Sequence, residues 1–453
     1  MAGVNRVLPD RFGDPVLQLL ILIAAASLMG GGGISFGLAN LAVQLAAIAL
    51  LAANPGAVRW FVKGAPRTLV ALVAATILFP LLQLVPLPAS VWQALPGRDL
   101  AASALGAAGE LGWFPYSLDS SRTLLSLIGL IVPFTALVLA WRLDRPALYR
   151  IPDAIVAAAL AGFALGVVQV FSNHEIGLLY DDTDMPGVLF GLFANRNTTA
   201  LAFDVALIML AALPPQRPLS PPWLAKAGVA LLLGAGVIMT QSRSGMGLLA
   251  VPVLFALVRS AALYWRRRKG PGAAPTARAA PLVAGIAALC LAAAVSVPLI
   301  GSSRIGMGVE RFAGGETVRP QIWEDGLYAA QRYWPAGAGM GTFDEVFQID
   351  ESLEYVSPKR AARAHNDYLE LGIEAGVAGF AILAGWFLWI AGAASVARRI
   401  GDPWPAWGAA ASLAAIAVQS AVDYPLRNQA MLCTAALLVA MLLRAGWPRR
   451  GTP

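Results

Sequence analysis

The stretch TLLSLIGLIVPFTALVLAW, residues 123–141, decides the fold class of this chain. It contains no charged side chain, and its length falls within the roughly 17–25 residues that a helix needs to cross a bilayer. Comparable stretches recur along all 453 residues, of which 58% are hydrophobic and 13% charged. Because a soluble protein carries about 25% charged residues, we expect an integral membrane protein.

The apolar stretches are long and continuous, without the alternation that marks barrel strands. Helices are then the structure that satisfies each backbone amide within its own segment. The sequence therefore predicts an all-α polytopic membrane protein of about 12 transmembrane helices. The expected spans are 15–29, 33–53, 67–87, 123–141, 152–171, 198–213, 223–240, 245–264, 280–300, 367–396, 405–422 and 429–446.

The basic residues give the expected orientation. If the N-terminus is cytoplasmic, most of the 33 Lys and Arg residues fall between spans on the cytoplasmic side. Short cytoplasmic loops carry such an excess, so we expect both termini in the cytoplasm. The net charge of +7 is then explained by these dispersed loops, and no nucleic-acid partner is expected.

The spans divide the chain into three parts. Residues 1–300 are expected to hold transmembrane helices with short loops. Residues 301–366 form one sizeable loop outside the membrane, with short helices predicted around 320–334 and 343–355. Residues 367–453 hold the last transmembrane helices and a cytoplasmic tail.

No His, Cys and Asp cluster has the spacing of a metal site, so zinc is not expected. Gly337–Gly341 matches no nucleotide-binding pattern and instead predicts a tight turn after Pro335. We therefore expect no cofactor.

His365 is one of two histidines in the chain and precedes the predicted span 367–396. An imidazole at the boundary between membrane and water can accept a proton from a hydroxyl near neutral pH, which makes His365 a candidate general base. The alternative is a hydrogen-bonded interface histidine that caps the helix.

Three arginines on the same predicted side are candidates for binding a diphosphate, because a guanidinium presents a planar fork of donors to phosphate oxygens. Arg243 lies in a short turn between two spans, and Arg196 also stands at a helix start. Arg319 precedes Pro320 and a predicted aromatic helix. The alternatives are lipid-headgroup anchoring for Arg196 and Arg243 and a surface salt bridge for Arg319.

Three further charged residues lie in or between spans. Asp204 falls inside the predicted span 198–213, where carboxylates are costly and usually face the bundle interior; its role stays open. Asp423 and Arg427 lie in the last turn on the outer side of the membrane and are candidates for an ion pair with each other.

Taken in order, seven short motifs resemble the O-antigen ligase and O-antigen polymerase-like superfamily of bacterial envelope proteins. The resemblance covers roughly residues 190–430. The matching motifs are Phe193–Asn197, Ser242–Gly245, Arg319–Trp323, Pro335–Phe343, His365–Leu369, Glu374–Gly376 and Asp423–Leu426.

The resemblance implies that a glycan carried on undecaprenyl diphosphate is transferred to an acceptor hydroxyl at the periplasmic face of the bacterial inner membrane, without metal or nucleotide. His365 would activate the acceptor for inverting attack. Arg243 and Arg319 would hold the diphosphate, with Arg196 nearby. The residues expected to support them are Asn195, Asn197, Ser242, Asn366, Asp367, Tyr368, Asp423 and Arg427.

Several functions stay open. Ligation of O-antigen to lipid A-core is favoured, with polymerisation of repeat units on a growing polysaccharide as the alternative. Protein glycosylation is less favoured because no large C-terminal periplasmic domain is evident. A transporter of lipid-linked glycan is the alternative of another class, although its ionisable groups would be expected near the membrane midplane.

Overall fold

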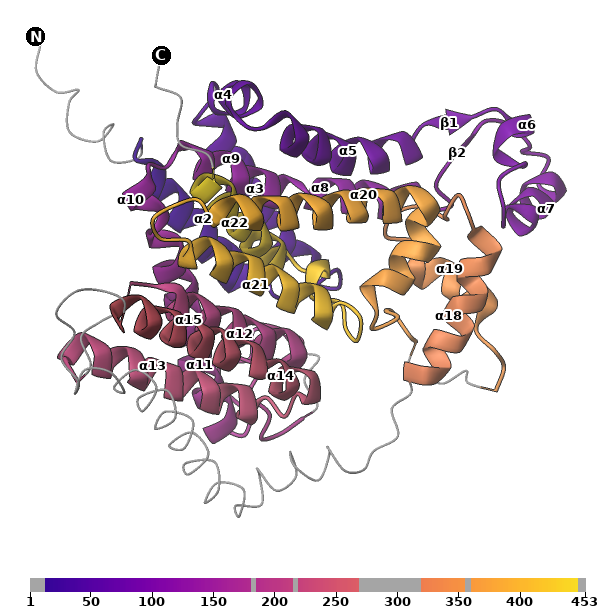
Figure 1. Cartoon of the computed structure of the whole chain (residues 1–453). Helices are drawn as coiled ribbons and strands as arrows, with labels where there is room; N and C mark the ends of the chain where they lie inside the picture. Colours follow the sequence, from indigo (N-terminus) through magenta and orange to yellow (C-terminus); the bar gives the residue numbers. More distant parts are fainter. Residues whose placement is uncertain (1–12, 181–184, 215–218, 269–318, 355–359, 447–453) are drawn as a thin grey trace, which may run out of the picture.

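The computed structural model describes residues 13–180, 185–214, 219–268, 319–354 and 360–446 (Figure 1). The predicted span 280–300 and residues 301–318 of the predicted loop 301–366 lie outside the described residues. Helices dominate the described part. The first half contains α2 (Pro15–Met29), α3 (Gly37–Ala52), α4 (Ala57–Gly64), α5 (Arg67–Gln83), β1 (Pro86–Leu87), α6 (Ala89–Trp92), α7 (Asp99–Ala107), β2 (Phe114–Pro115), α8 (Ser120–Gly129), α9 (Ile131–Arg142), α10 (Arg145–Leu148) and α11 (Arg150–Phe171).

The second half completes the bundle. It contains α12 (Arg196–Ala212), α13 (Pro221–Met239), α14 (Arg243–Leu248), α15 (Ala250–Arg268), α18 (Arg319–Tyr333), α19 (Phe343–Asp350), α20 (Asp367–Ala397), α21 (Trp404–Gln419), the 3-10 turn η2 (Pro425–Arg427) and α22 (Gln429–Gly446).

Every predicted span that falls in the described residues lies on one helix or, for 123–141 and 245–264, on two consecutive helices. Among the described residues, five segments are long and apolar enough to cross a membrane, and the bent pair α3–α4 makes a sixth if it is counted as one span. The all-α membrane class is therefore supported, while the count of 12 spans stays a prediction. The five segments are Ser120–Arg142, Arg145–Phe171, Pro221–Met239, Arg243–Arg266 and Asp367–Ala397.

The helix α12 lies at the centre of one half of the bundle, packed by α11, α13, α15 and α21. The helix α22 has the same place in the other half, against α9, α20, α21 and α2. Their shared neighbour α21 joins the two halves (Figure 1). The start of α12 and the turn between α21 and α22 therefore lie near each other at one end of the bundle.

A small lobe stands at that end (Figure 1). It comprises β1, α6, α7, β2, α18 and α19, and we call it the end lobe. The expected helices around 320–334 and 343–355 correspond to α18 and α19. A core of its own, including Tyr333, Phe343, Phe347 and Ile373, joins α18 and α19 to the start of α20.

The helix α20 is broken near its start by the glycine-rich loop that the sequence predicted after Pro335. Gly376 has φ 53° and ψ −142°, and the N–H of Val377 donates to the carbonyl of Pro335 at 3.0 Å. A Cβ at Gly376 would lie 2.0 Å from that carbonyl oxygen, so only glycine fits. The break separates an end piece of α20, residues 367–375, from the apolar part that follows.

The run Gly30–Gly33 forms a close seam between α2 and two distant segments. The carbonyl of Gly31 accepts from the N–H of Ala194, and that of Gly30 from the N–H of Ala430. A Cβ at Gly31 would lie 2.1 Å from the carbonyl oxygen of Leu192. This seam fixes the turn that leads into α12 against the start of α22.

Candidate active site at the end of the bundle

His365 occupies a tight turn immediately before α20. Its φ of 51° lies in the left-handed region, which side chains other than glycine adopt rarely. The next residue, Asn366, is the N-cap of α20, and its side chain accepts from the N–H groups of Tyr368 and Leu369. The turn therefore projects the imidazole from the helix start instead of continuing the helix.

The imidazole of His365 is paired with a carboxylate. Its Nδ1 lies 3.1 Å from Oδ1 of Asp423, and the ring centroid lies 4.9 Å from that of Tyr424. The side chain of Asp423 is fully buried, whereas that of His365 is 32% exposed. A carboxylate accepts only, so Nδ1 carries the proton and Nε2 of the neutral ring is the basic nitrogen.

The side-chain amide of Asn195, the N-cap residue of α12, also binds this pair. Its Nδ2 donates to Oδ1 and Oδ2 of Asp423 at 3.2 and 3.1 Å. Burial alone would raise the pKa of Asp423, but the hydrogen bond from His365 and the charges of His365 and Arg319 hold it below the usual carboxyl value. Asp423 is therefore ionised at neutral pH. Burial raises the pKa of Tyr424 to about 12, so its hydroxyl stays protonated there.

Each of the three arginines begins a helix: Arg196 begins α12, Arg243 begins α14 and Arg319 begins α18. All three are partly exposed. Nη1 of Arg319 donates to the carbonyl of Val422 at 2.6 Å, next to Asp423. This contact brings the start of α18 to the turn that holds the carboxylate.

A hydroxyl–amide contact links the other two arginine segments. Ser242 caps α14 through the N–H of Gly245, and its Oγ donates to Oδ1 of Asn197 at 2.7 Å. Asn195, two residues earlier, binds Asp423. One chain of contacts thus joins the segments 195–197, 242–245, 319, 365 and 422–424 at this end of the bundle.

The expected pairing of Asp423 with Arg427 is wrong. Arg427 donates to Asp367 at 3.2 Å, to Glu370 at 3.1 Å and to Glu374 at 2.9 Å. Burial opposes its charge, but the three carboxylates raise the pKa of Arg427 above its usual value. The turn separates the two residues because Asp423 precedes η2 and Arg427 ends it, so they face different partners.

Asp367 and Tyr368 also bind the last outer turn and the end of α21. Oδ2 of Asp367 accepts from Oγ of Ser420 at 2.8 Å, and the hydroxyl of Tyr368 donates to the carbonyl of Ala417 at 2.6 Å. These residues hold the start of α20 against α21, and the described structure shows no hydrogen bond from either side chain to the His365 ring.

Four residues near this site are not predicted from the sequence to have a role in it: Glu370, Glu374, Gln419 and Tyr424. Asp367, Glu370 and Glu374 have the i, i+3, i+7 spacing that places side chains on one helix face, which was a usable signal. Nε2 of Gln419 donates to Oγ of Ser244 at 3.0 Å and ties α21 to α14. No local pattern marks that contact.

Residues 228–384 match the family model described as O-antigen ligase. Over this segment the chain is similar to the O-antigen ligase family. The matched residues include Arg243, Arg319 and His365, whereas Asn195 and Asp423 lie on either side of the match. Comparison with curated proteins gives no match.

Within the described residues, no group of three or more His, Cys, Asp or Glu side chains is arranged to hold a metal ion. Asp204 lies fully buried in α12, and neither of its carboxylate oxygens has a hydrogen-bond partner among the described residues. Its place in the middle of the helix separates it from the end of the bundle where Asn195, His365 and Asp423 meet.

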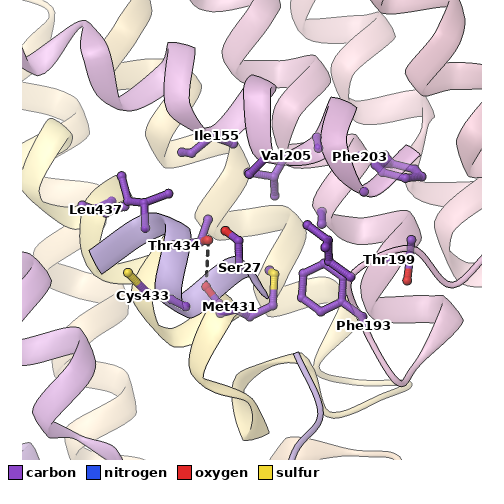
Figure 2. Close-up of a pocket in the computed structure, with 18 residues that line it drawn as sticks. Ser27, Ile155, Phe193, Thr199, Phe203, Val205, Met431, Cys433, Thr434 and Leu437 are labelled. Carbon is purple, nitrogen blue, oxygen red and sulfur yellow. Dashed lines mark hydrogen bonds between the residues drawn. The ribbon is translucent and has the colours of Figure 1, made fainter. Parts of the chain in front are cut away.

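An apolar pocket lies between α2, α11, α12 and α22 (Figure 2). The hydroxyls of Thr199 and Thr434 on its wall donate to the carbonyls of Phe190 and Ala430 and are already satisfied. Phe193 forms its edge, two residues before Asn195. None of its lining side chains is a carboxylate, an imidazole or a cation.

Proposed function

We propose that this protein transfers a glycan from a polyprenyl diphosphate carrier, undecaprenyl diphosphate in bacteria, to an acceptor hydroxyl. The pairing of His365 with Asp423, at the same end of the bundle as Arg196, Arg243 and Arg319, carries this proposal. It joins a base to the cations that a diphosphate leaving group requires.

In the proposed reaction, Nε2 of His365 accepts the proton of the acceptor hydroxyl. The hydroxyl oxygen forms a bond to the anomeric carbon while the bond from that carbon to the diphosphate oxygen breaks. The electron pair of the broken bond leaves with the diphosphate, and the configuration of the anomeric carbon is inverted. Asp423 holds the ring and stabilises the imidazolium that forms.

The arginines are proposed to bind the diphosphate. Charge builds up on the bridging oxygen as the bond breaks, and a fixed cation stabilises that charge more in the transition state than in the ground state. Arg319 is fixed next to Asp423 by its bond to Val422, and Arg243 begins a helix whose cap Ser242 binds Asn197. Arg196 begins the helix that Asn195 caps.

Orientation and location complete the proposal. We place the protein in the bacterial inner membrane with both termini cytoplasmic and the end lobe in the periplasm, where a lipid-linked glycan already exported is presented. Residues 1–300 would supply the first transmembrane helices, 301–366 the periplasmic loop, and 367–453 the last helices.

The central test uses purified protein in nanodiscs, donor lipid extracted from a deletion strain, and lipid A-core from the same strain. We expect His365→Ala and Arg243→Ala to abolish transfer while accumulating in the membrane at the wild-type level. His174→Ala, at the other histidine, and Arg59→Ala, on the exposed face of α4, are matched controls that retain transfer. Full transfer by H365A would contradict the role of His365 as the general base. Full transfer by R243A would contradict the role of Arg243 in binding the diphosphate.

Ligation to lipid A-core is the favoured version, and polymerisation is the alternative. A deletion strain that lacks all long chains on lipid A and accumulates lipid-linked polymer indicates ligation. Accumulation of single lipid-linked repeat units indicates polymerisation. A transporter would move donor lipid across a vesicle membrane without forming product, so product formation by the purified protein excludes pure transport.

A further inference from the structure

The carboxylate of Glu370 lies directly behind the His365 turn. Glu370 is in the first turn of α20, and its side chain is fully buried. Its Oε1 accepts from the backbone N–H of Ala364 at 2.9 Å. Its Oε2 accepts from Nη1 of Arg363 at 3.1 Å and from Nη2 of Arg427 at 3.1 Å. One side chain thus binds both residues that immediately precede His365.

The residues that follow His365 are also fixed, by backbone contacts with the turn after α21. The N–H of Asp367 donates to the carbonyl of Ser420 at 2.8 Å and also lies 3.3 Å from that of Asp423. Between these two attachments the backbone of His365 is held at φ 51°. A left-handed residue other than glycine persists only where its surroundings determine its conformation.

We propose that Glu370 is a positioning residue for His365, an inference that rests on the proposed transfer function. Asp423 fixes the imidazole at Nδ1, which leaves the ring free to pivot about that contact. Glu370 fixes the backbone from which the ring projects. The direction of Nε2 follows from both attachments together, because a base must lie within hydrogen-bond reach of the proton it removes.

Glu374 provides a matched control in the same charge network. It is also fully buried, and its Oε2 accepts from Nη1 of Arg427 at 2.9 Å. Its Oε1 faces the N–H of Phe343 at 3.4 Å, on the side of the glycine-rich loop and away from residues 363–365. Neutralising Glu374 removes one partner of Arg427 without touching the His365 turn.

The test compares Glu370→Gln and Glu374→Gln in initial-rate measurements with the extracted donor lipid and lipid A-core. A glutamine at 370 keeps one acceptor oxygen but turns an N–H₂ group toward the donors of Arg363 and Arg427. We expect E370Q to lower kcat about tenfold or more with the donor KM within twofold of wild type. We expect the kcat of E374Q to stay within threefold of the wild-type value. We expect its melting temperature to fall by about as much as that of E370Q.

The melting temperatures separate positioning from general structure, since both variants remove one charge from the Arg427 network. An E370Q enzyme with wild-type kcat, or an equal loss of kcat in E374Q, overturns the positioning role. If E370Q does not accumulate, Arg363→Gln tests the same attachment, and it is expected to lower kcat several-fold at unchanged donor KM. A wild-type kcat in R363Q then overturns the inference.

The outcome is distinct from failure of the proposed function. If wild-type protein forms no product, or H365A retains full transfer, the function itself is wrong. If H365A is inactive and E370Q is fully active, the transfer function stands and only the positioning role of Glu370 falls.

Discussion

Nδ1 of His365 lies 3.1 Å from Oδ1 of Asp423, although the two residues are 58 positions apart in the chain. The contact joins the turn before α20 to the turn between α21 and α22. The sequence alone presents His365 as a candidate base. The contact with Asp423 assigns the proton of the neutral ring to Nδ1 and leaves Nε2 as the basic nitrogen. Two predictions follow from this pair and three from the surrounding structure.

Replacing Asp423 by Asn tests the catalytic value of the pair. Losing a hydrogen bond to a charged group costs about 1.5–3 kcal/mol, and each 1.36 kcal/mol of barrier is about tenfold in rate. We expect D423N to lower kcat at least about tenfold with little change in donor KM. Steady-state kinetics of the purified variant measure this, and an unchanged kcat would show that Asp423 serves only the fold.

Acid stability tests the ionisation of Asp423. Its pKa in the folded protein lies below the ordinary carboxyl value of about 3.9. A group with a depressed pKa contributes stability that is fully present above the unfolded pKa and is lost as pH falls through the folded pKa. The stability that Asp423 contributes should therefore be lost only as the pH falls below about 4, which the melting-temperature difference between wild type and D423N measures. A gap that closes already near pH 6 would contradict the depressed pKa.

The Gly30–Gly33 seam is predicted to tolerate no side chain at Gly31. A Cβ there would lie 2.1 Å from the carbonyl oxygen of Leu192, whereas one at Gly37 would meet nothing within 4 Å. Overpacking a tight interior costs about 1–3 kcal/mol. We expect Gly31→Ala to lower the melting temperature and Gly37→Ala to leave it unchanged. Equal melting curves for the two variants would count against the seam.

Arg98 is predicted to hold the end lobe together. Its buried guanidinium donates to the carbonyls of Pro96, Tyr116 and Gly337, and it lies 5.6 Å from the ring centroid of Tyr116. Arg98→Ala leaves these carbonyls without a donor, at a cost of about 3 kcal/mol. Limited proteolysis should then cleave within residues 88–119 faster than in wild type. The exposed Arg59→Ala is the control, and identical digestion of both variants would oppose this role.

Cysteine labelling tests whether the residues of the proposed site face the same side of the membrane. In a background with Cys290 and Cys433 replaced by Ser, we expect a membrane-impermeant thiol reagent to label Arg243→Cys and His365→Cys from the periplasm. Arg59→Cys should be labelled only after the membrane is opened. If residues 243 and 365 react from opposite sides, no common site exists and the transfer proposal fails.

The sequence alone determined the class of this protein and the position of most of its helices. Long uncharged runs such as 123–141 require a helix in a bilayer, because no water is present to satisfy the backbone. Local signals also placed the short helices at Arg319–Tyr333 and Phe343–Asp350 and the turn after Pro335. The family resemblance likewise came from short motifs, and the match over 228–384 supports it.

The partners of the charged residues were decided by tertiary structure. Asp423 and Arg427 are four residues apart and looked like a pair, yet η2 turns them toward His365 and toward three carboxylates of α20. Glu370 carried a visible helical spacing, but its contact with Ala364 depends on the left-handed turn at His365. Sequence patterns report the period of a helix and its apolar face. Which ion pairs form depends on how separate helices and turns pack, and that is fixed only when the chain is folded.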